Sequence, residues 1–290
     1  MSKKIYIFLP VHNRRDITRR FLGYLKSQSY QDYHLILIDD GSTDNTDEMV
    51  RVEITAVTVI KGEGDWWWAG SLQQGYNWLK THDVPLSDIV LITNDDTHFE
   101  PDFFEKAVAI LRDRERTLLL AQCFYSKTGD LNDAGVHVDW KRLTFHQAKT
   151  VEEINCLSTR GLFLKVGDLL ATGGFYPKLL PHYLSDYEFT IRANHKGMKL
   201  LTDPSLKIWF DEEASGYHSL EEKSFLASLK RLFSIKSSRN PLAWTVFIAL
   251  ASPWPWKLTN WLRVLKAFFE NVIECWKASR RPRLTSTGSS

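Results

Sequence analysis

The alternation of short apolar runs with longer amphipathic segments constrains the fold of this chain more than any other feature. Runs typical of buried strands occupy residues 5–9, 34–38, 56–60 and 89–93. Segments with helical spacing of apolar residues alternate with them, at 16–28, 43–51, 71–80 and 101–112. Buried strands that alternate with helices predict a doubly wound, mostly parallel α/β sheet.

A cluster of polar residues follows each of these expected strands, at 10–14, 39–44, 61–65 and 94–96. In open parallel sheets, ligands bind in the crevice at the carboxyl ends of the strands. The clusters should therefore meet at one edge of the sheet, and we expect them to form a single composite site.

The second half of the chain is less regular. We expect strands at 118–124 and 162–166 and a helix at 187–194. From about residue 220, long helical patterns take over and end in an amphipathic helix at 257–277. We predict an α/β domain over 1–218, a helical region over 219–278 and a disordered tail over 279–290.

Composition limits the function classes. The chain has 290 residues, enough for one large domain with an appendage, and its net charge of +2 does not favour nucleic-acid binding. Its three cysteines form no C-x-x-C pair, which argues against structural zinc and favours a reducing compartment. No run reaches the roughly 18–20 apolar residues of a membrane-spanning helix.

Three acidic segments are candidates for chemistry, and each has a structural alternative. Asp95 and Asp96 could hold Mg²⁺ or Mn²⁺, or could form an acidic turn before the next helix. Asp39 and Asp40 could bind a ribose or a base, or could belong to a glycine turn that caps a helix. Asp186 could act as a general base, or could be a helix N-terminal acid that favours the macrodipole.

Tryptophans are the other unusual feature, with 11 in the chain. Residues 66–68 are consecutive tryptophans after a glycine-containing loop; they could pack on a sugar ring or be buried at the start of a helix. Tryptophans and basic residues of the C-terminal helices fit an anchor at a membrane interface. A helical lid and a homodimer interface are the alternatives for that region.

In combination, these motifs resemble the family 2 glycosyltransferases of the GT-A fold. The resemblance covers about residues 4–218 and rests on the segments 10–14, 38–44, 93–96, 161, 173–175 and 186–189. The segment 66–71 is similar to a rhamnosyltransferase-like branch of the family. The chain departs from the family pattern at three positions. An acid is usual where Asn94 stands, Glu is usual at Ser185, and Asp is usual at Glu188.

The resemblance implies roles for individual residues. Asp186 matches the catalytic base, with Glu188 as second choice, and Asp96 and His218 match metal ligands. The residues expected to bind the nucleotide-sugar donor are Pro10, His12, Arg14, Asp39, Asp40, Asp95, Trp67 and Arg192.

The implied reaction is a single displacement. Asp186 would deprotonate an acceptor hydroxyl, which attacks the anomeric carbon opposite the diphosphate and inverts its configuration. Mg²⁺ or Mn²⁺ would assist the leaving diphosphate as a Lewis acid. The chain is thus predicted to be a metal-dependent inverting glycosyltransferase of hexosyltransferase type.

The resemblance also implies partners and a location. The donor would be a dTDP-, UDP- or GDP-linked sugar, with rhamnose one candidate, and the acceptor a glycan or lipid-linked molecule of cell-envelope polysaccharide synthesis. We expect a cytoplasmic protein, peripheral on the inner face of the cytoplasmic membrane, that does not bind nucleic acid. The alternatives are a nucleotidyltransferase and a non-catalytic relative that binds sugar nucleotides. The absence of a glycine-rich phosphate loop after the first strand disfavours the nucleotidyltransferase.

Overall fold

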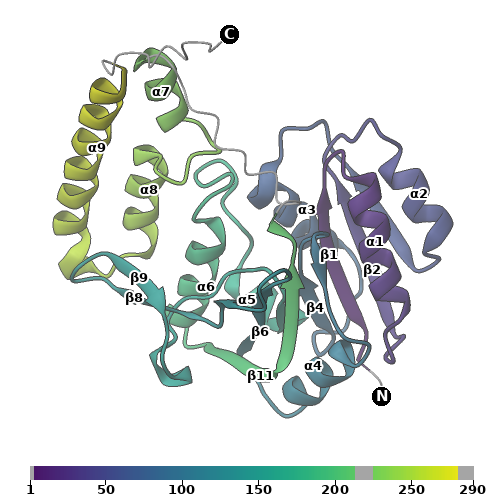
Figure 1. The fold of residues 1–290 in the computed structure, drawn as a ribbon. Coiled ribbons are helices and arrows are strands. Elements are labelled where there is room, and N and C mark those ends of the chain that lie inside the picture. Colours follow the sequence, from purple (N-terminus) through teal and green to yellow (C-terminus); the bar gives the residue numbers. More distant parts are fainter. Residues whose placement is uncertain (1–2, 213–224, 280–290) are drawn as a thin grey trace, which may run out of the picture.

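A curled, mostly parallel sheet forms the centre of the molecule, as the computed structural model shows for residues 3–212 and 225–279 (Figure 1). The strands run in the order β3 (Val57–Lys61), β2 (Tyr33–Asp39), β1 (Ile5–Val11), β4 (Ile89–Ile92), β10 (Leu162–Lys165), β6 (Thr117–Tyr125), β11 (Lys199–Phe210) and β5 (Thr97–His98). Strands β1 to β4 are mutually parallel, and β11 is parallel to β6. The antiparallel members are β10 and β5, and the short β7 (Leu131–Asp133) that pairs with β6.

Helices cover both faces of this sheet because side chains of alternate strand residues point in opposite directions. In β1, Ile5 and Ile7 belong to one core, and Phe8 belongs to the other. The first core contains α1 (Arg15–Lys26), α2 (Thr46–Glu53) and α4 (Phe103–Leu111). The second contains α3 (Trp67–Thr81), α5 (Val166–Thr172) and α6 (Ser185–His195). Burial on both faces explains why these strands read as continuous apolar runs.

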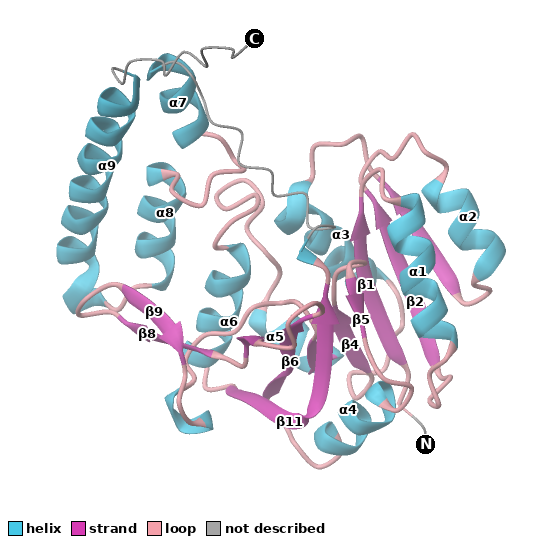
Figure 2. Ribbon diagram, in the orientation of Figure 1, coloured by secondary structure: helices cyan, strands magenta, loops and turns pink. Residues whose placement is uncertain are grey.

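The C-terminal helices stand beside α6, away from the strands of the sheet (Figure 2). They are α7 (Phe225–Leu232), α8 (Pro241–Ala251) and α9 (Lys257–Ser279), with the short 3₁₀ turn η3 (Trp254–Trp256) before α9. Phe247 of α8 and Ile191 of α6 share a third core with the hairpin of β8 (Val136–Asp139) and β9 (Thr144–Gln147). This core joins the helical region to the helix that begins at Ser185.

The fold class predicted from the sequence is confirmed: a doubly wound, mostly parallel sheet with C-terminal helices. The first four expected strands and helices are all present within a few residues of their predicted bounds. Helix α2 begins at Thr46, three residues later than predicted. The Asp44 side chain accepts hydrogen bonds from the backbone N–H and from the hydroxyl of Thr46, and these bonds stabilise a turn before the helix.

The irregular middle section contains elements that periodicity did not reveal. The elements that were not predicted include strand β11, the hairpin β8–β9, helix α5 and the 3₁₀ turn η1 (Val151–Glu153). The expected tail at 279–290 lies outside the described residues apart from Ser279. In the described part of the chain, no helix has both the length and the apolar character needed to cross a membrane.

Candidate functional site

Two adjoining cavities open at the carboxyl ends of the central strands. The first, which we call the sheet-edge cavity, has a volume of about 420 Å³ and is lined by residues that follow β1, β2 and β4 and by the start of α3. The second, the hairpin cavity, has a volume of about 690 Å³ and is lined by β7, the hairpin β8–β9 and the start of α6. Trp68, Asn94 and Arg160 line both cavities and form their common boundary.

Asp40 builds one wall of the sheet-edge cavity by holding a loop. Its carboxylate accepts hydrogen bonds from the backbone N–H groups of Gly64, Trp66 and Trp67, at 2.9, 2.9 and 3.2 Å. Gly41 permits this close approach, since a Cβ at this position would lie 2.7 Å from the Gly64 nitrogen. The structure therefore assigns Asp40 to positioning the tryptophan loop, with its carboxylate already occupied by backbone donors.

The remaining predicted residues lie at the carboxyl ends of β1 and β2, and some of them line the cavity while others support its wall. Pro10 and His12 line the sheet-edge cavity, and His12 Nδ1 lies 2.6 Å from the carbonyl oxygen of Asp40. Asp39 is buried, is not among the lining residues, and accepts a hydrogen bond from the backbone N–H of Ser42. Asp39 thus stabilises the glycine turn, which is the structural alternative predicted for it from the sequence.

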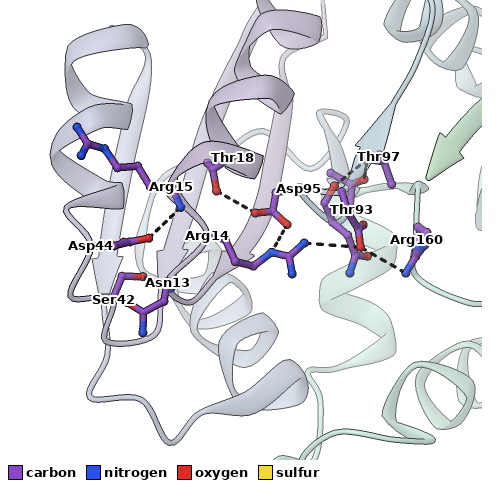
Figure 3. Close-up of polar contacts among 12 residues, drawn as sticks. Asn13, Arg14, Arg15, Thr18, Ser42, Asp44, Thr93, Asp95, Thr97 and Arg160 are labelled. Atoms are coloured by element: carbon purple, nitrogen blue, oxygen red, sulfur yellow. Dashed lines mark hydrogen bonds and ion pairs between the residues drawn. The ribbon is translucent and has the colours of Figure 1, made fainter. Parts of the chain in front are cut away.

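Asp95 is tied to the first helix across the sheet edge (Figure 3). One oxygen accepts a hydrogen bond from Arg14 Nε at 2.8 Å, and the other accepts one from the Thr18 hydroxyl at 2.9 Å. Burial raises the pKa of this carboxyl, while Arg14 and Thr18 oppose the shift. Arg14 and Asp95 both line the cavity as predicted, but the Asp95 oxygens already have protein partners.

Asp96 differs from its neighbour in having an open oxygen. Its Oδ2 lies 3.7 Å from Arg14 and 3.9 Å from Arg160, too far for hydrogen bonds. Its Oδ1 is buried and has no hydrogen-bond partner in the described part of the chain. A buried carboxylate oxygen without a partner is costly unless a ligand satisfies it. The geometry therefore fits a cation or a hydrogen-bond donor at Asp96.

A complete metal site made of protein groups alone is absent from residues 3–212 and 225–279, where no three His, Cys, Asp or Glu side chains gather for it. His218, the second predicted metal ligand, lies outside the described residues. Magnesium is commonly held by one or two carboxylates together with substrate phosphates. The single open oxygen of Asp96 is compatible with that mode of binding.

Two of the three consecutive tryptophans reach the cavities. Trp67 lines the sheet-edge cavity and has a φ of 54°, a left-handed conformation that is strained for a bulky residue. Trp68 lines both cavities, and its indole N–H donates to the Thr159 hydroxyl. Trp66 instead packs against the core beneath the sheet. The buried alternative is therefore confirmed for Trp66, while contact with a sugar stays a prediction for Trp67 and Trp68.

Asp186 stands at the wall of the hairpin cavity, in the first turn of α6. One carboxylate oxygen accepts a hydrogen bond from the backbone N–H of Tyr187 at 2.9 Å. Burial raises the pKa of Asp186 to about 6, and the negative charge of Asp133 adds to the shift. A carboxylate with a pKa near the working pH is well suited to accept a proton.

Asp133 and Arg160 line the hairpin cavity and were not found in the sequence. Asp133 is the last residue of β7, and its carboxylate accepts a hydrogen bond from the backbone N–H of Gly135. Burial raises its pKa, while a hydrogen bond from Ser158 and the charge of Arg160 oppose the shift. Neither residue belongs to a periodic segment, so the sequence carried no signal for them.

Glu188, the second candidate base, forms an ion pair with Arg192, which was predicted to bind the donor. Arg192 Nε and Nη2 donate to the Glu188 carboxylate at 2.8 and 3.0 Å. The guanidinium also donates to the carbonyls of Thr172 and Gly174. Neither residue lines the two cavities, so the structure assigns this pair to the packing of α6 against α5.

Residues 6–166 match the family model described as glycosyl transferase family 2. No curated protein matches the chain by sequence.

Solved structures share the fold at low identity. A mannosyltransferase from Pyrobaculum calidifontis, in complex with GDP-Man and Mn²⁺, has a TM-score of 0.54 and 15% identity over 99% of this chain and 76% of its own. TarS residues 1–349 from S. aureus, in complex with UDP-GlcNAc, have a TM-score of 0.57 and 16% identity over 96% and 84%. GalNAc-T7 with UDP, GalNAc and Mn²⁺ has a TM-score of 0.61 and 13% identity over 95% and 58%.

Proposed function

The chain belongs to glycosyl transferase family 2, and from this premise we propose that it transfers a sugar from a nucleoside-diphosphate donor to an acceptor hydroxyl with inversion at the anomeric carbon. One observation carries the proposal: two cavities meet at Trp68, Asn94 and Arg160, with Asp96 in one and Asp186 in the other. A transfer between two substrates requires such a shared boundary, because the reacting atoms must come within about 3–3.5 Å of each other.

The sheet-edge cavity is the proposed donor site. It lies at the carboxyl ends of the parallel strands, where open α/β sheets bind their ligands. Arg14 and Arg160 supply positive charge beside Asp96, as a diphosphate requires. The likeness to structures that hold GDP-Man or UDP-GlcNAc supports a nucleotide sugar without selecting the base.

Asp96 is the proposed cation ligand. Its open Oδ1 and the Mn²⁺ in two similar structures support a divalent cation, Mn²⁺ or Mg²⁺, bound jointly by Asp96 and the donor diphosphate. When bound, such a cation would stabilise the negative charge that develops on the leaving diphosphate.

The hairpin cavity is the proposed acceptor site, because it combines a base with an aromatic and polar lining. Asp186 accepts the proton of the acceptor hydroxyl as the new bond from that oxygen to the anomeric carbon forms. The bond from the anomeric carbon to the diphosphate oxygen breaks, and the nucleoside diphosphate leaves. Phe145 and Tyr187, whose rings stack at 5.7 Å, and the polar Asn132 and Gln147 line the same space. This lining suits a glycan ring, with or without a lipid.

The test is donor binding across UDP-, GDP- and dTDP-linked sugars, dTDP-rhamnose included, with Mn²⁺, Mg²⁺ or EDTA. We expect one donor to bind in a metal-dependent manner and Asp96→Ala to lose that dependence. Asp102→Ala is the matched control, since Asp102 is an aspartate that lines neither of the two cavities. Absence of binding to every donor under every condition would contradict the proposal and favour a non-catalytic relative.

A membrane-facing role for α9 is a second part of the proposal. Its residues Leu258, Leu262, Leu265, Phe269, Ile273 and Trp276 recur at helical spacing and are 45–67% exposed. Lys257, Lys266 and Lys277 lie on the same helix, and the sequence continues with Arg280, Arg281 and Arg283. The helix also carries Glu270 and Glu274, but its basic residues outnumber them. An apolar stripe on a helix of net positive charge favours an anionic lipid surface over a neutral one. This would place the enzyme beside a lipid-linked acceptor of envelope polysaccharide synthesis, on the inner face of the cytoplasmic membrane.

Sedimentation with vesicles tests this part. We expect binding to vesicles that contain phosphatidylglycerol, weaker binding to phosphatidylcholine alone, and loss of binding in Leu265→Asp/Phe269→Asp. Val52→Asp, on an exposed apolar residue of α2, is the control. The alternative outcome is a protein that does not bind vesicles, sediments as a dimer and becomes monomeric in the double variant. That outcome would identify the apolar stripe as a subunit interface.

A further inference from the structure

Lys236 brings the C-terminal helical region back to the sheet-edge cavity. It lies in the segment between α7 and α8, yet it lines this cavity together with residues that follow β1 and β4. Its Nζ is 5.5 Å from the centroid of the Trp67 ring, within reach of a cation–π contact. A residue from the helical region therefore forms part of the cavity wall.

The turn that carries Lys236 is held in place by a buried asparagine. Asn240 Nδ2 donates to the carbonyls of Phe233 and Ser234, and Asn240 Oδ1 accepts from the backbone N–H groups that begin α8. The Trp244 indole N–H also donates to the carbonyl of Ser238. These contacts fix the backbone on both sides of Lys236, so its position is a property of the packed helical region.

Among the described residues, Lys236 differs from the two arginines of this cavity in its ion pairs. Arg14 Nε lies 2.8 Å from Asp95, and Arg160 lies 3.9 Å from Asp96. Within residues 3–212 and 225–279, the structure shows no carboxylate that forms an ion pair with Lys236. Its neighbour in the cavity wall, His182, has a pKa lowered by burial and by the charge of Lys236, so this imidazole is uncharged near neutral pH. A positive charge that faces a cavity without an internal partner suits an anionic ligand.

We propose that Lys236 binds the diphosphate of the donor, so that the C-terminal helical region completes the donor site. The proposal rests on the proposed function, since it takes the sheet-edge cavity as the donor site. It assigns the helical region a part in donor binding in addition to any contact with a membrane. Trp67 would hold the lysine side chain over the cavity, and the anionic phosphates would take the place of the missing carboxylate.

Binding of nucleotides that differ only in phosphate number tests the proposal. The probes are UDP, GDP and dTDP and the corresponding monophosphates, measured by calorimetry on the full chain with Mn²⁺. For the base that binds best, we expect Lys236→Ala to weaken diphosphate binding about tenfold, with a smaller effect on the monophosphate. Lys236→Arg should retain most of the affinity, because it keeps the charge.

Lys230→Ala is the matched control, since it removes an exposed lysine of α7 that does not line the cavity. Thermal unfolding of each variant reports whether the fold is intact. Wild-type binding that Lys236→Ala leaves unchanged, or weakens equally for the two nucleotides, would overturn the role of Lys236 and leave the proposed function standing. A wild-type protein that binds none of the nucleotides would instead refute the proposed function itself.

Discussion

The two cavities are built by different means. The sheet-edge cavity is formed largely by residues at the ends of strands, and two of its acids are bound by other protein groups: Asp40 by backbone N–H groups, and Asp95 by Arg14 and Thr18. Asp96, the proposed cation ligand, is the acid of this cavity with an open oxygen in the described part of the chain. The hairpin cavity is formed by short strands outside the parallel part of the sheet, β7 and the hairpin β8–β9, and by the start of α6. There, one oxygen of Asp186 accepts a backbone N–H, and burial raises the pKa of the carboxyl.

This difference separates carboxylates that hold loops and helices in place from a carboxylate that can accept a proton from a substrate. Carboxylates that accept several hydrogen bonds keep their geometry and are poorly available to a substrate proton. A carboxyl whose pKa lies near 6 exchanges its proton readily at neutral pH. Asp40 and Asp95, whose oxygens are held by two or three hydrogen bonds, therefore act as structural carboxylates, whereas Asp186 combines a backbone hydrogen bond to one oxygen with a raised pKa and a place in the wall of the hairpin cavity. Four measurements test this distinction.

The largest effect is expected for Asp186→Asn, which removes the base. Sugar transfer should fall by roughly 10²–10⁴-fold, the usual contribution of a general base. Donor binding, measured by calorimetry, should not change, because Asp186 lies in the hairpin cavity and not in the sheet-edge cavity. Transfer at the wild-type rate in this variant would exclude Asp186 as the base and break the distinction between the cavities.

Arg192→Met tests the claim that the Glu188–Arg192 pair is structural. The variant leaves the buried Glu188 carboxylate without its partner, which should lower the free energy of unfolding by about 3 kcal/mol. The measurement is urea unfolding, with the donor dissociation constant as second readout. A protein of unchanged stability but weakened donor binding would return Arg192 to the donor site.

The pH profile should show the ionisation of Asp186. Because the base must be ionised, kcat/KM should fall about tenfold per pH unit below about pH 6 and level off above it. The raised pKa also means that the folded state binds more protons than the unfolded state between about pH 4 and 6, so stability should fall as pH rises through this window. Asp186→Asn should remove the part of this slope that belongs to Asp186, so the slope should differ between wild type and variant, and an identical slope in the two proteins would contradict the assignment.

The smallest effect is expected for Trp68→Ala, at the shared boundary. Because Trp68 lines both cavities, its loss should raise the KM of the donor and the KM of the acceptor a few-fold each, which corresponds to the free energy of about one aromatic contact. Trp254→Ala, on an exposed tryptophan of η3, should leave both unchanged in detergent-free buffer without membranes. A change in one KM alone would show that Trp68 serves one substrate.

Local patterns in the sequence determined the frame of this protein. Apolar runs buried on both faces identified the parallel strands, and the polar residues directly after them located the sheet-edge cavity. Asp96 and Asp186 could be found because each follows or begins a regular element, and regular elements have a periodicity that can be read. The resemblance to a family then gave these two residues their roles.

Only the tertiary structure decided which side chains are free to act. Asp40 is engaged by backbone N–H groups of the tryptophan loop, and Arg192 by the carbonyls of Thr172 and Gly174, at separations that no spacing rule covers. Glu188 and Arg192 stand four residues apart on one helix, but only the structure shows that they pair with each other. Lys236 follows Pro10 by more than two hundred residues, and yet both line one cavity. Such contacts depend on how whole elements pack, and packing joins residues that are distant in the chain, so local periodicity carries no record of them.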